Sequence, residues 1–176
     1  MKKIVFFDAD GTLWYPKSTK YEKHPVWVYK TYPDIDRARQ EFTLIPGVIE
    51  TLENLKKSGV KLVILSTNPK TKEEANAQMK DSAEYFGLSH LFDEIHGTRP
   101  EHGSKGEYIL EILKKYDLKK KDALMVGDSY EWDYSSARGV RVDGVLIDNN
   151  YENRHKHHMR VRRKIKNFEE LMNFIN

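Results

Sequence analysis

Two aspartates near the start of the chain have the chemistry and the spacing of a nucleophile paired with an acid. Asp8 directly follows the apolar run over residues 4–7, and Asp10 lies two residues later, in a turn that Gly11 permits. A strand over this run places the Asp8 carboxylate at its carboxyl end, where ligands collect in parallel sheets. An isolated aspartate is usually a surface or capping residue, so the interpretation depends on what other segments bring to the same edge.

Donors for an anion follow a second predicted strand, over residues 60–65. Ser66, Thr67 and Asn68 offer hydroxyl and amide groups to phosphate oxygens, although on their own they are typical of a turn. Lys105 adds a positive charge in the first turn of a later helix, where an acid is the usual residue because of the helix dipole. That local conflict favours a functional role for this lysine.

More carboxylates follow the predicted strand over residues 123–126. Asp128 comes directly after Gly127, and Asp133 lies a little more than one helical turn later. Carboxylate oxygens are ligands that Mg²⁺ prefers, and a further carboxylate can orient the metal or its waters. The sequence therefore offers a metal site beside the first pair of aspartates.

These groups are the ones that cleavage of a phosphate monoester requires. An enzyme must lower the barrier of this reaction by more than about 20 kcal/mol, which one carboxylate cannot do. A metal must shield the charge between the anionic nucleophile and the phosphoryl group. An acid must protonate the leaving oxygen, and donors must hold the equatorial oxygens.

Short apolar runs alternate with segments of helical periodicity, which predicts a parallel sheet with helices on both faces. We expect strands over residues 4–7, 60–65, 123–126 and 145–147, the last being the final strand. Two capping boxes, Thr71 with Glu74 and Ser104 with Glu107, begin two of the helices. Other helices are expected between residues 46 and 59, near 130–138 and after 167.

The composition is that of one folded domain over residues 1–176. Charged residues make up 32% of the chain and the mean hydropathy is −0.73, yet clear apolar runs persist. The absence of cysteine excludes disulfides and thiolate metal sites. No run approaches the ~20 apolar residues of a membrane span, and the first apolar run is too short for a signal peptide. We therefore expect a cytoplasmic protein that does not bind membranes.

The chain resembles the haloacid dehalogenase superfamily of aspartate-based phosphatases in four ordered motifs. They are Asp8-Ala9-Asp10-Gly11-Thr12, Leu65-Ser66-Thr67-Asn68, Lys105, and Gly127-Asp128-Ser129 with Asp133. The resemblance covers about residues 4–148. It implies a Rossmann-like three-layer α/β sandwich, with a central, mostly parallel sheet and helices on both faces.

The resemblance also implies a role for each carboxylate. Asp8 is expected to be the nucleophile, and Asp10 the general acid that later activates water. Asp8, the backbone carbonyl of Asp10 and Asp128 are expected to bind Mg²⁺, with Asp133 as a ligand or a partner of the metal's waters. The implied enzyme is a Mg²⁺-dependent phosphatase that works through a phosphoaspartate on Asp8.

The resemblance assigns phosphate binding to residues of the other motifs. Ser66 and Lys105 are expected to hold the phosphoryl oxygens, with Thr67 as the alternative hydroxyl because it directly precedes Asn68. The residues expected to contact substrate are Gly11, Thr12, Ser66, Thr67, Asn68 and Lys105.

The acid at Asp10 favours a phosphatase, because the dehalogenases of this superfamily do not need it. The intervals between the motifs leave no room for a large cap domain, so we expect a capless or minimally capped, open site. Leu13-Trp14 is similar to the magnesium-dependent phosphatase branch, whereas Gly11 and Thr67 depart from its pattern. Such a site suits a small phosphorylated molecule, admits a phosphoprotein, and would allow a homo-oligomer to complete the pocket.

Two segments carry no assigned chemistry. An irregular, aromatic-rich flap over about residues 14–44 fits two interpretations equally: a wall against substrate or another subunit, or packing over the edge of the core. The segment 154–166 holds seven Lys or Arg and no acid, although the net charge of the chain is only +3. Of its histidines, His155, His157 and His158, the adjacent two point apart, which favours a solvated surface over a metal site. Nucleic-acid binding is disfavoured, since basic runs are commonly just solvated.

Three other functions remain as alternatives. A noncatalytic module of the same fold would bind nucleic acid or an acidic partner through the basic segment, and a phosphotransferase would pass the phosphoryl group to another acceptor. A phosphorylation-controlled receiver domain also uses Asp, Mg²⁺ and Lys. Receivers usually carry the acceptor after the third strand, whereas Asp8 follows the first.

Overall fold

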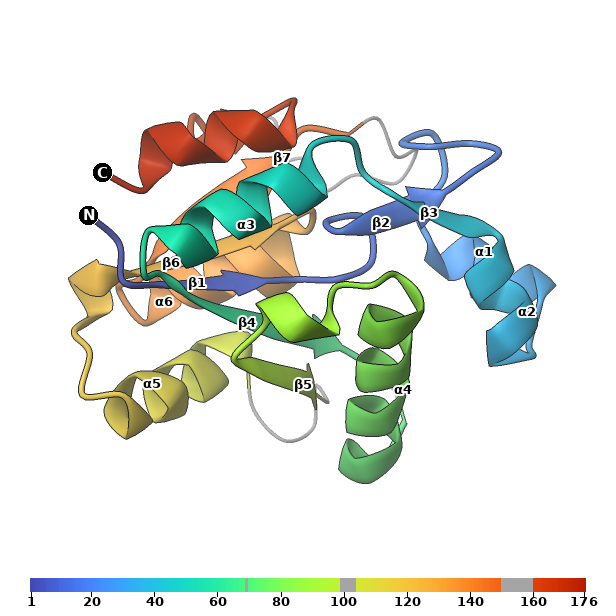
Figure 1. Ribbon diagram of the computed structural model, residues 1–176, viewed down its shortest axis with the longest axis horizontal. Helices are drawn as coiled ribbons and strands as arrows, with labels where there is room; N and C mark the ends of the chain where they lie inside the picture. Colours follow the sequence, from blue (N-terminus) through green and yellow to red (C-terminus); the bar gives the residue numbers. More distant parts are fainter. Residues whose placement is uncertain (69, 99–103, 150–159) are drawn as a thin grey trace.

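The centre of the protein is a six-stranded parallel sheet (Figure 1). The computed structural model describes residues 1–68, 70–98, 104–149 and 160–176. The strands are β1 (Ile4–Phe7), β4 (Lys61–Thr67), β5 (Glu94–Thr98), β6 (Ala123–Gly127), β7 (Asp143–Ile147) and β8 (Lys164–Ile165). The strand order is β5-β4-β1-β6-β7-β8, and β1 pairs with β4 on one side and with β6 on the other.

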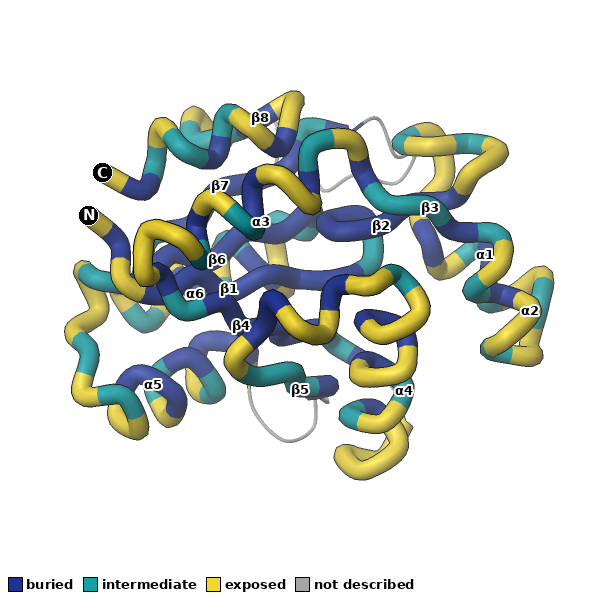
Figure 2. Tube along the Cα trace, in the orientation of Figure 1, coloured by how far each residue is buried: buried dark blue, intermediate teal, exposed yellow. Residues whose placement is uncertain are grey.

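Helices cover both faces of this sheet because alternate strand residues are apolar on each side. These helices are α3 (Val48–Lys57), α4 (Lys72–Tyr85), α5 (Lys105–Lys115), α6 (Ser136–Gly139), a π-helix (Tyr130–Ser135) and 3₁₀ helices (Ser89–Leu91, Lys120–Asp122 and Phe168–Phe174). Val5 and Phe7 face the cluster formed with α3, α4 and the C-terminal 3₁₀ helix, whereas Ile4 and Phe6 face α5 and α6. The strands of the sheet are buried along most of their length (Figure 2). No helix among these described residues is long and apolar enough to cross a membrane.

The two capping boxes expected from the sequence form at the starts of α4 and α5. At α4 the Thr71 hydroxyl accepts from the Glu74 backbone N–H, and the Glu74 carboxylate accepts from the Thr71 backbone N–H. Ser104 and Glu107 make the same reciprocal pair before α5. The box at α5 matters for the site, because it fixes the position at which Lys105 begins the helix.

The segment 14–44 is not irregular, which corrects the expectation from its sequence. It forms an antiparallel ribbon of β2 (Trp14–Pro16) and β3 (Phe42–Leu44), with α1 (Val26–Thr31) and α2 (Ile35–Gln40) between them. Figure 1 shows this flap beyond the carboxyl end of β1. Elements of three to six residues are too short to produce a recognisable hydrophobic period, which is why the sequence pattern missed them.

Two further strands were missed, and β7 is not the last strand as expected. β5 extends one edge of the sheet beside β4, and β8 extends the other edge beside β7. β8 lies inside the basic segment 154–166, where Ile165 is buried and Arg163 pairs with Asp143 at 2.8 Å. The described half of this segment is thus part of the sheet edge. The three histidines lie outside the described residues.

The sheet topology creates a crevice at the carboxyl end of β1. After β1 the chain continues to β4 on one side of β1 and later returns to β6 on the other side. The connections therefore diverge at the carboxyl end of β1. Ligands bind at such switch points in open α/β sheets, because the diverging loops leave a gap there. The residues singled out from the sequence follow the carboxyl ends of β1, β4 and β6, apart from Lys105, which begins α5.

Candidate active site

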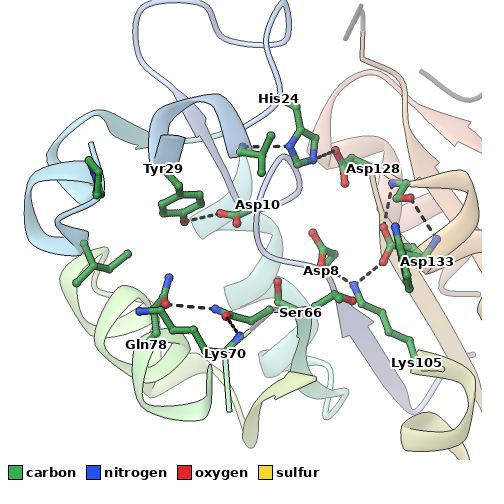
Figure 3. Close-up of a pocket in the computed structure, with 17 residues that line it drawn as sticks. Asp8, Asp10, His24, Tyr29, Ser66, Lys70, Gln78, Lys105, Asp128 and Asp133 are labelled. Atoms are coloured by element: carbon green, nitrogen blue, oxygen red, sulfur yellow. Dashed lines mark hydrogen bonds and ion pairs between the residues drawn. The ribbon is translucent and has the colours of Figure 1, made fainter. Parts of the chain in front are cut away.

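The loop after β1 is a tight turn that separates its two aspartates. Asp8 donates its backbone N–H to the Val126 carbonyl at 2.9 Å, which ties the start of the loop to β6. Gly11 adopts a φ of 78°, a conformation that favours glycine, and its N–H bonds the Trp14 carbonyl at 2.8 Å. The turn lets Asp8 and Asp10 enter the same pocket from different directions (Figure 3).

Lys105 joins two carboxylates at the floor of the pocket. Its Nζ lies 2.5 Å from Oδ1 of Asp8 and 2.6 Å from Oδ1 of Asp133, and all three side chains are buried. Burial alone would lower the pKa of Lys105, but the charges of Asp133 and Asp8 outweigh it and hold that pKa above its usual value. The lysine is therefore a fixed positive charge against both carboxylates.

Three buried carboxylates could together hold a cation. Asp8, Asp128 and Asp133 each offer an oxygen, and these oxygens lie within 4.8 Å of one another. Burial, followed by the charges of Asp8 and Asp133, raises the pKa of Asp128 well above its usual value. Burial, followed by the charge of Asp8, also raises the pKa of Asp133, to about 6, although Lys105 opposes this. One lysine does not balance three carboxylates, so the donor set and its charge fit a divalent cation with oxygen ligands.

Gly127 lets Asp133 reach this cluster. A Cβ on Gly127 would lie 2.1 Å from Oδ2 of Asp133, which is closer than atoms can approach. The same oxygen accepts the backbone N–H of Ser129 at 2.9 Å. The π-helix that carries Asp133 can therefore fold back against the end of β6 only because residue 127 has no side chain.

Asp10 stands apart from the carboxylate cluster, in a different hydrogen-bond environment. Its Oδ1 accepts from Trp14 Nε1 at 2.7 Å and from the Tyr29 hydroxyl at 2.9 Å. Desolvation in the pocket, followed by the charge of Asp8, raises the pKa of Asp10 to about 6 in spite of these two donors. Burial and the nearby Asp10 raise the pKa of Tyr29 well above 10, so its hydroxyl keeps its proton.

A polar network lines the β4 side of the pocket. Ser66 is buried and Thr67 is half-buried, and both line the pocket. The Thr67 hydroxyl lies 3.5 Å from that of Thr98, whereas Ser66 makes no side-chain hydrogen bond to another described residue. Asn68 accepts from the Lys70 backbone N–H at 3.0 Å and donates to Gln78 at 3.2 Å.

His24 reaches the pocket from the flap, and its position was not foreseen from the sequence. Its Nδ1 accepts the backbone N–H of Val26 at 3.1 Å, which leaves the proton of the neutral ring on Nε2. That Nε2 lies 3.6 Å from Oδ2 of Asp128. Burial lowers the pKa of His24, which favours the neutral ring. A single histidine in a segment without a recognised period gives no signal that could have located it.

The pocket has a volume of about 440 Å³ and brings together eight of the residues predicted to form the site. They are Asp8, Asp10, Ser66, Thr67, Asn68, Lys105, Asp128 and Asp133. Gly11 and Thr12, also expected to contact substrate, do not line it; the Thr12 side chain is fully buried and its N–H bonds the Ala9 carbonyl. Lining residues that the sequence did not indicate include His24, Val26, Pro33, Ile35, Lys70, Gln78 and Trp132.

The model of one protein family, described as haloacid dehalogenase-like hydrolase, matches residues 9–147. This chain belongs to that family. Pyrophosphatase PpaX of Bacillus cereus is 34% identical over 164 residues, covering 72% of this chain and 74% of that protein. Ribulose-1,5-bisphosphate 5-phosphatase of Halopiger xanaduensis is 30% identical over 109 residues, which cover 62% of this chain and only 44% of the relative.

Solved structures of the family share the fold. A HAD phosphatase from Thermococcus onnurineus superposes with a TM-score of 0.73 at 20% identity, covering 100% of this chain and 98% of that chain. A haloacid dehalogenase-like hydrolase from Streptococcus pneumoniae gives a TM-score of 0.73 at 20% identity, covering 99% of each chain. The predicted family, the α/β fold class and the enzyme class, a phosphatase of this family, are confirmed. The roles of individual residues stay predictions.

Proposed function

We propose that this protein is a Mg²⁺-dependent phosphatase that hydrolyses a small phosphate monoester through a phosphoaspartate on Asp8. The observation that carries the proposal is the division of the pocket carboxylates into two environments. Asp8 is bound by the Lys105 ammonium at 2.5 Å, whereas Asp10 has a pKa raised to about 6. Two carboxyl groups in different environments, one against an ammonium and one with a raised pKa, are what a nucleophile and an acid require.

In the first step, the Asp8 carboxylate attacks the phosphorus while the bond to the leaving oxygen breaks. The proton of Asp10 passes to that oxygen, so the product leaves as an alcohol. Oδ1 of Asp10 already accepts from Trp14 and Tyr29, so the acid carries its proton on Oδ2. Ser66 and Lys105 hold the phosphoryl oxygens and stabilise the charge that develops on them.

In the second step, water hydrolyses the acyl phosphate. Asp10, now a carboxylate, takes a proton from the water as its oxygen attacks the phosphorus, and the bond from phosphorus to Asp8 breaks. Asp8 returns as a carboxylate and inorganic phosphate is released. Asp10 is protonated again at the end, so the two steps balance and the same residue serves first as acid and then as base.

Asp8, Asp128 and the backbone carbonyl of Asp10 would hold Mg²⁺, with Asp133 as a ligand or a partner of its waters. Bound there, the ion shields the negative charge between the nucleophile and the phosphoryl group. The charge of the site supports a cation. Three carboxylates offer oxygens within 4.8 Å of one another, and among the described residues Lys105 is the one ammonium that pairs with members of this cluster.

A small substrate fits this pocket better than a large one. The volume of about 440 Å³ lies in the range of small-molecule sites, and α1 and α2 of the flap contribute Val26 and Ile35 to its wall. Two relatives support the same choice, because one is named for pyrophosphate and the other for ribulose 1,5-bisphosphate.

The direct test is turnover of p-nitrophenyl phosphate with and without Mg²⁺, for the wild type and for Asp8→Asn. We expect Mg²⁺-dependent turnover that Asp8→Asn lowers by at least 1,000-fold, on the order of the loss seen when a catalytic nucleophile is removed. Borohydride trapping followed by mass spectrometry should find homoserine at position 8. Asp81→Asn, an exposed aspartate on α4, is the matched control and should retain full turnover. Normal activity of Asp8→Asn would exclude this residue as the nucleophile.

A further inference from the structure

The pocket has a second polar end, formed by Lys70 and Gln78, that the hydrolytic mechanism does not use. Figure 3 shows these two side chains across the pocket from Lys105 and Asp133, with Asp10 between the two ends. We propose that Lys70 and Gln78 form a second anion subsite, which selects phosphate monoesters carrying a further negatively charged group on the leaving alcohol. This inference rests on the proposed function, since it concerns the substrate of the same site.

The hydrogen bonds of Asn68 determine which end of the Gln78 amide is available to a ligand. Oδ1 of Asn68 accepts the backbone N–H of Lys70 at 3.0 Å, so the other end of the amide, Nδ2, is its donor. That donor reaches Oε1 of Gln78 at 3.2 Å. The Gln78 oxygen is therefore occupied, and its Nε2 keeps two hydrogens to donate. Asn68 is only 7% exposed, so the group that fixes this direction is held in the protein interior.

Lys70 gives the same end of the pocket a positive charge. Among the described residues, no carboxylate lies within ion-pair distance of Lys70, and no acceptor bonds Nε2 of Gln78. The acids that line the pocket are Asp8, Asp10, Asp128 and Asp133, and of these only Asp10 lies toward the Lys70 end in Figure 3. A surface with an ammonium and an amide donor and without a competing acceptor binds a carboxylate or a phosphate.

The flap adds apolar surface to the same pocket, since Val26, Pro33 and Ile35 line it. A substrate with its scissile phosphate at Asp8 and its second anion at Lys70 would bury its linking carbons in this pocket. The oxygen that takes the proton would then lie near Asp10.

The test compares phosphate esters that differ only in the far group. Ethyl, propyl and butyl phosphate are each matched with the ester of the same length that ends in a carboxylate, and with the corresponding bisphosphate. We expect kcat/KM to favour a charged member of at least one length by about tenfold, and the favoured length reports the spacing of the two ends. Comparison of the carboxylate and bisphosphate series identifies which anion the subsite accepts.

Variants then assign the preference to these residues. Lys70→Met and Gln78→Leu should bring the ratio of charged to neutral kcat/KM toward one, and Lys70→Glu should bring it below one by repulsion. Lys80→Met, an exposed lysine on α4 that does not line the pocket, should leave the ratio unchanged. A wild type that hydrolyses neutral and charged esters equally, or a ratio that Lys70→Met and Lys70→Glu leave unchanged, overturns the subsite but not the phosphatase. A wild type with Mg²⁺ that hydrolyses none of the esters overturns the proposed function, and the subsite with it.

Discussion

The hydroxyl of Tyr29 on α1 donates a hydrogen bond to Oδ1 of Asp10 at 2.9 Å, although the two residues are 19 positions apart in the chain. The Tyr29 ring packs on Phe42 of β3 with 5.2 Å between ring centroids. The flap therefore holds one oxygen of the proposed acid and leaves the other toward the pocket. It contributes to the site as well as covering the edge of the core, where Trp14 is buried and stacks on Phe86.

Tyr29→Phe should slow the reaction in a way that depends on the leaving group. Without this donor, Trp14 is the one side-chain donor that the described residues still offer to Asp10, so protonation of a poor leaving group should become about tenfold slower. Propyl phosphate should show the loss in kcat, whereas 2,4-dinitrophenyl phosphate, whose leaving group needs no proton, should show little. Tyr32→Phe, on the same segment but outside the pocket, is the control. Equal losses on both substrates would assign Tyr29 a structural role only.

Lys105→Met should damage both activity and stability. Asp8 and Asp133 would lose the ammonium at 2.5 and 2.6 Å, and removing one partner of a buried ion pair costs about 3–5 kcal/mol. Chemical denaturation should show this lower free energy of unfolding, and kcat should fall by at least 100-fold. Lys114→Met, exposed on the same helix, should match the wild type in both measurements.

Gly127→Ala should displace Asp133 without changing any polar group. The new methyl would lie 2.1 Å from the Asp133 carboxylate, so the π-helix has to move and the fit of the cluster is lost. We expect turnover to fall by more than tenfold and the free energy of unfolding by about 1–3 kcal/mol, which is typical of overpacking. Gly139→Ala, where nothing lies within 4 Å, serves as the control. Retention of full turnover by Gly127→Ala would count against a role for Asp133.

Asp128→Asn should separate metal binding from electrostatic repulsion. Burial and then the neighbouring carboxylates already raise the pKa of Asp128, so a neutral amide should leave the metal-free protein as stable as the wild type or more stable. Mg²⁺ at 100 times its Kd should stabilise the wild type by about 2.7 kcal/mol, and Asp128→Asn should lose most of that gain. Thermal unfolding in EDTA and in Mg²⁺ measures both effects. An equal response of the two proteins to Mg²⁺ would place the ion elsewhere.

Asp143 should contribute a pH-dependent part of the stability. Lys2 lies 2.7 Å away and Arg163 2.8 Å away, and these charges hold the pKa of Asp143 below its usual value in spite of partial burial. A carboxyl whose folded pKa is lowered stabilises the protein above its unfolded pKa, about 4, and that contribution is lost as the pH falls through the folded pKa. Asp143→Asn should therefore reduce the free energy of unfolding at pH 7 by about 0.5–1 kcal/mol, since the pairs are partly exposed.

The difference between Asp143→Asn and the wild type should shrink when unfolding is measured below pH 4, and also in high salt. Asp81→Asn, exposed on α4, should show no such trend. A deficit in Asp143→Asn that stays constant from pH 7 to pH 3 would contradict this origin.

The features of this protein that depend on local interactions could be predicted from its sequence. Alternating strands and helices, the capping box that starts α5 at Lys105, and the turn at Gly11 follow from residues within a few positions of one another. The motif residues could be assigned to one edge of the sheet because strands that run parallel bring their carboxyl ends together. Family membership depends on these same local motifs.

The contacts between side chains that are distant in the sequence became visible only in the folded protein. Tyr29 bonds Asp10, His24 approaches Asp128, and Gln78 bonds Asn68, each across a gap in sequence that no periodic pattern describes. The edge strands β5 and β8 are likewise defined by their partners, since five and two residues carry too little pattern of their own. Local preferences act over one or two turns of chain. The shape and charge of the pocket arise from long-range packing, which a single sequence does not encode in a readable form.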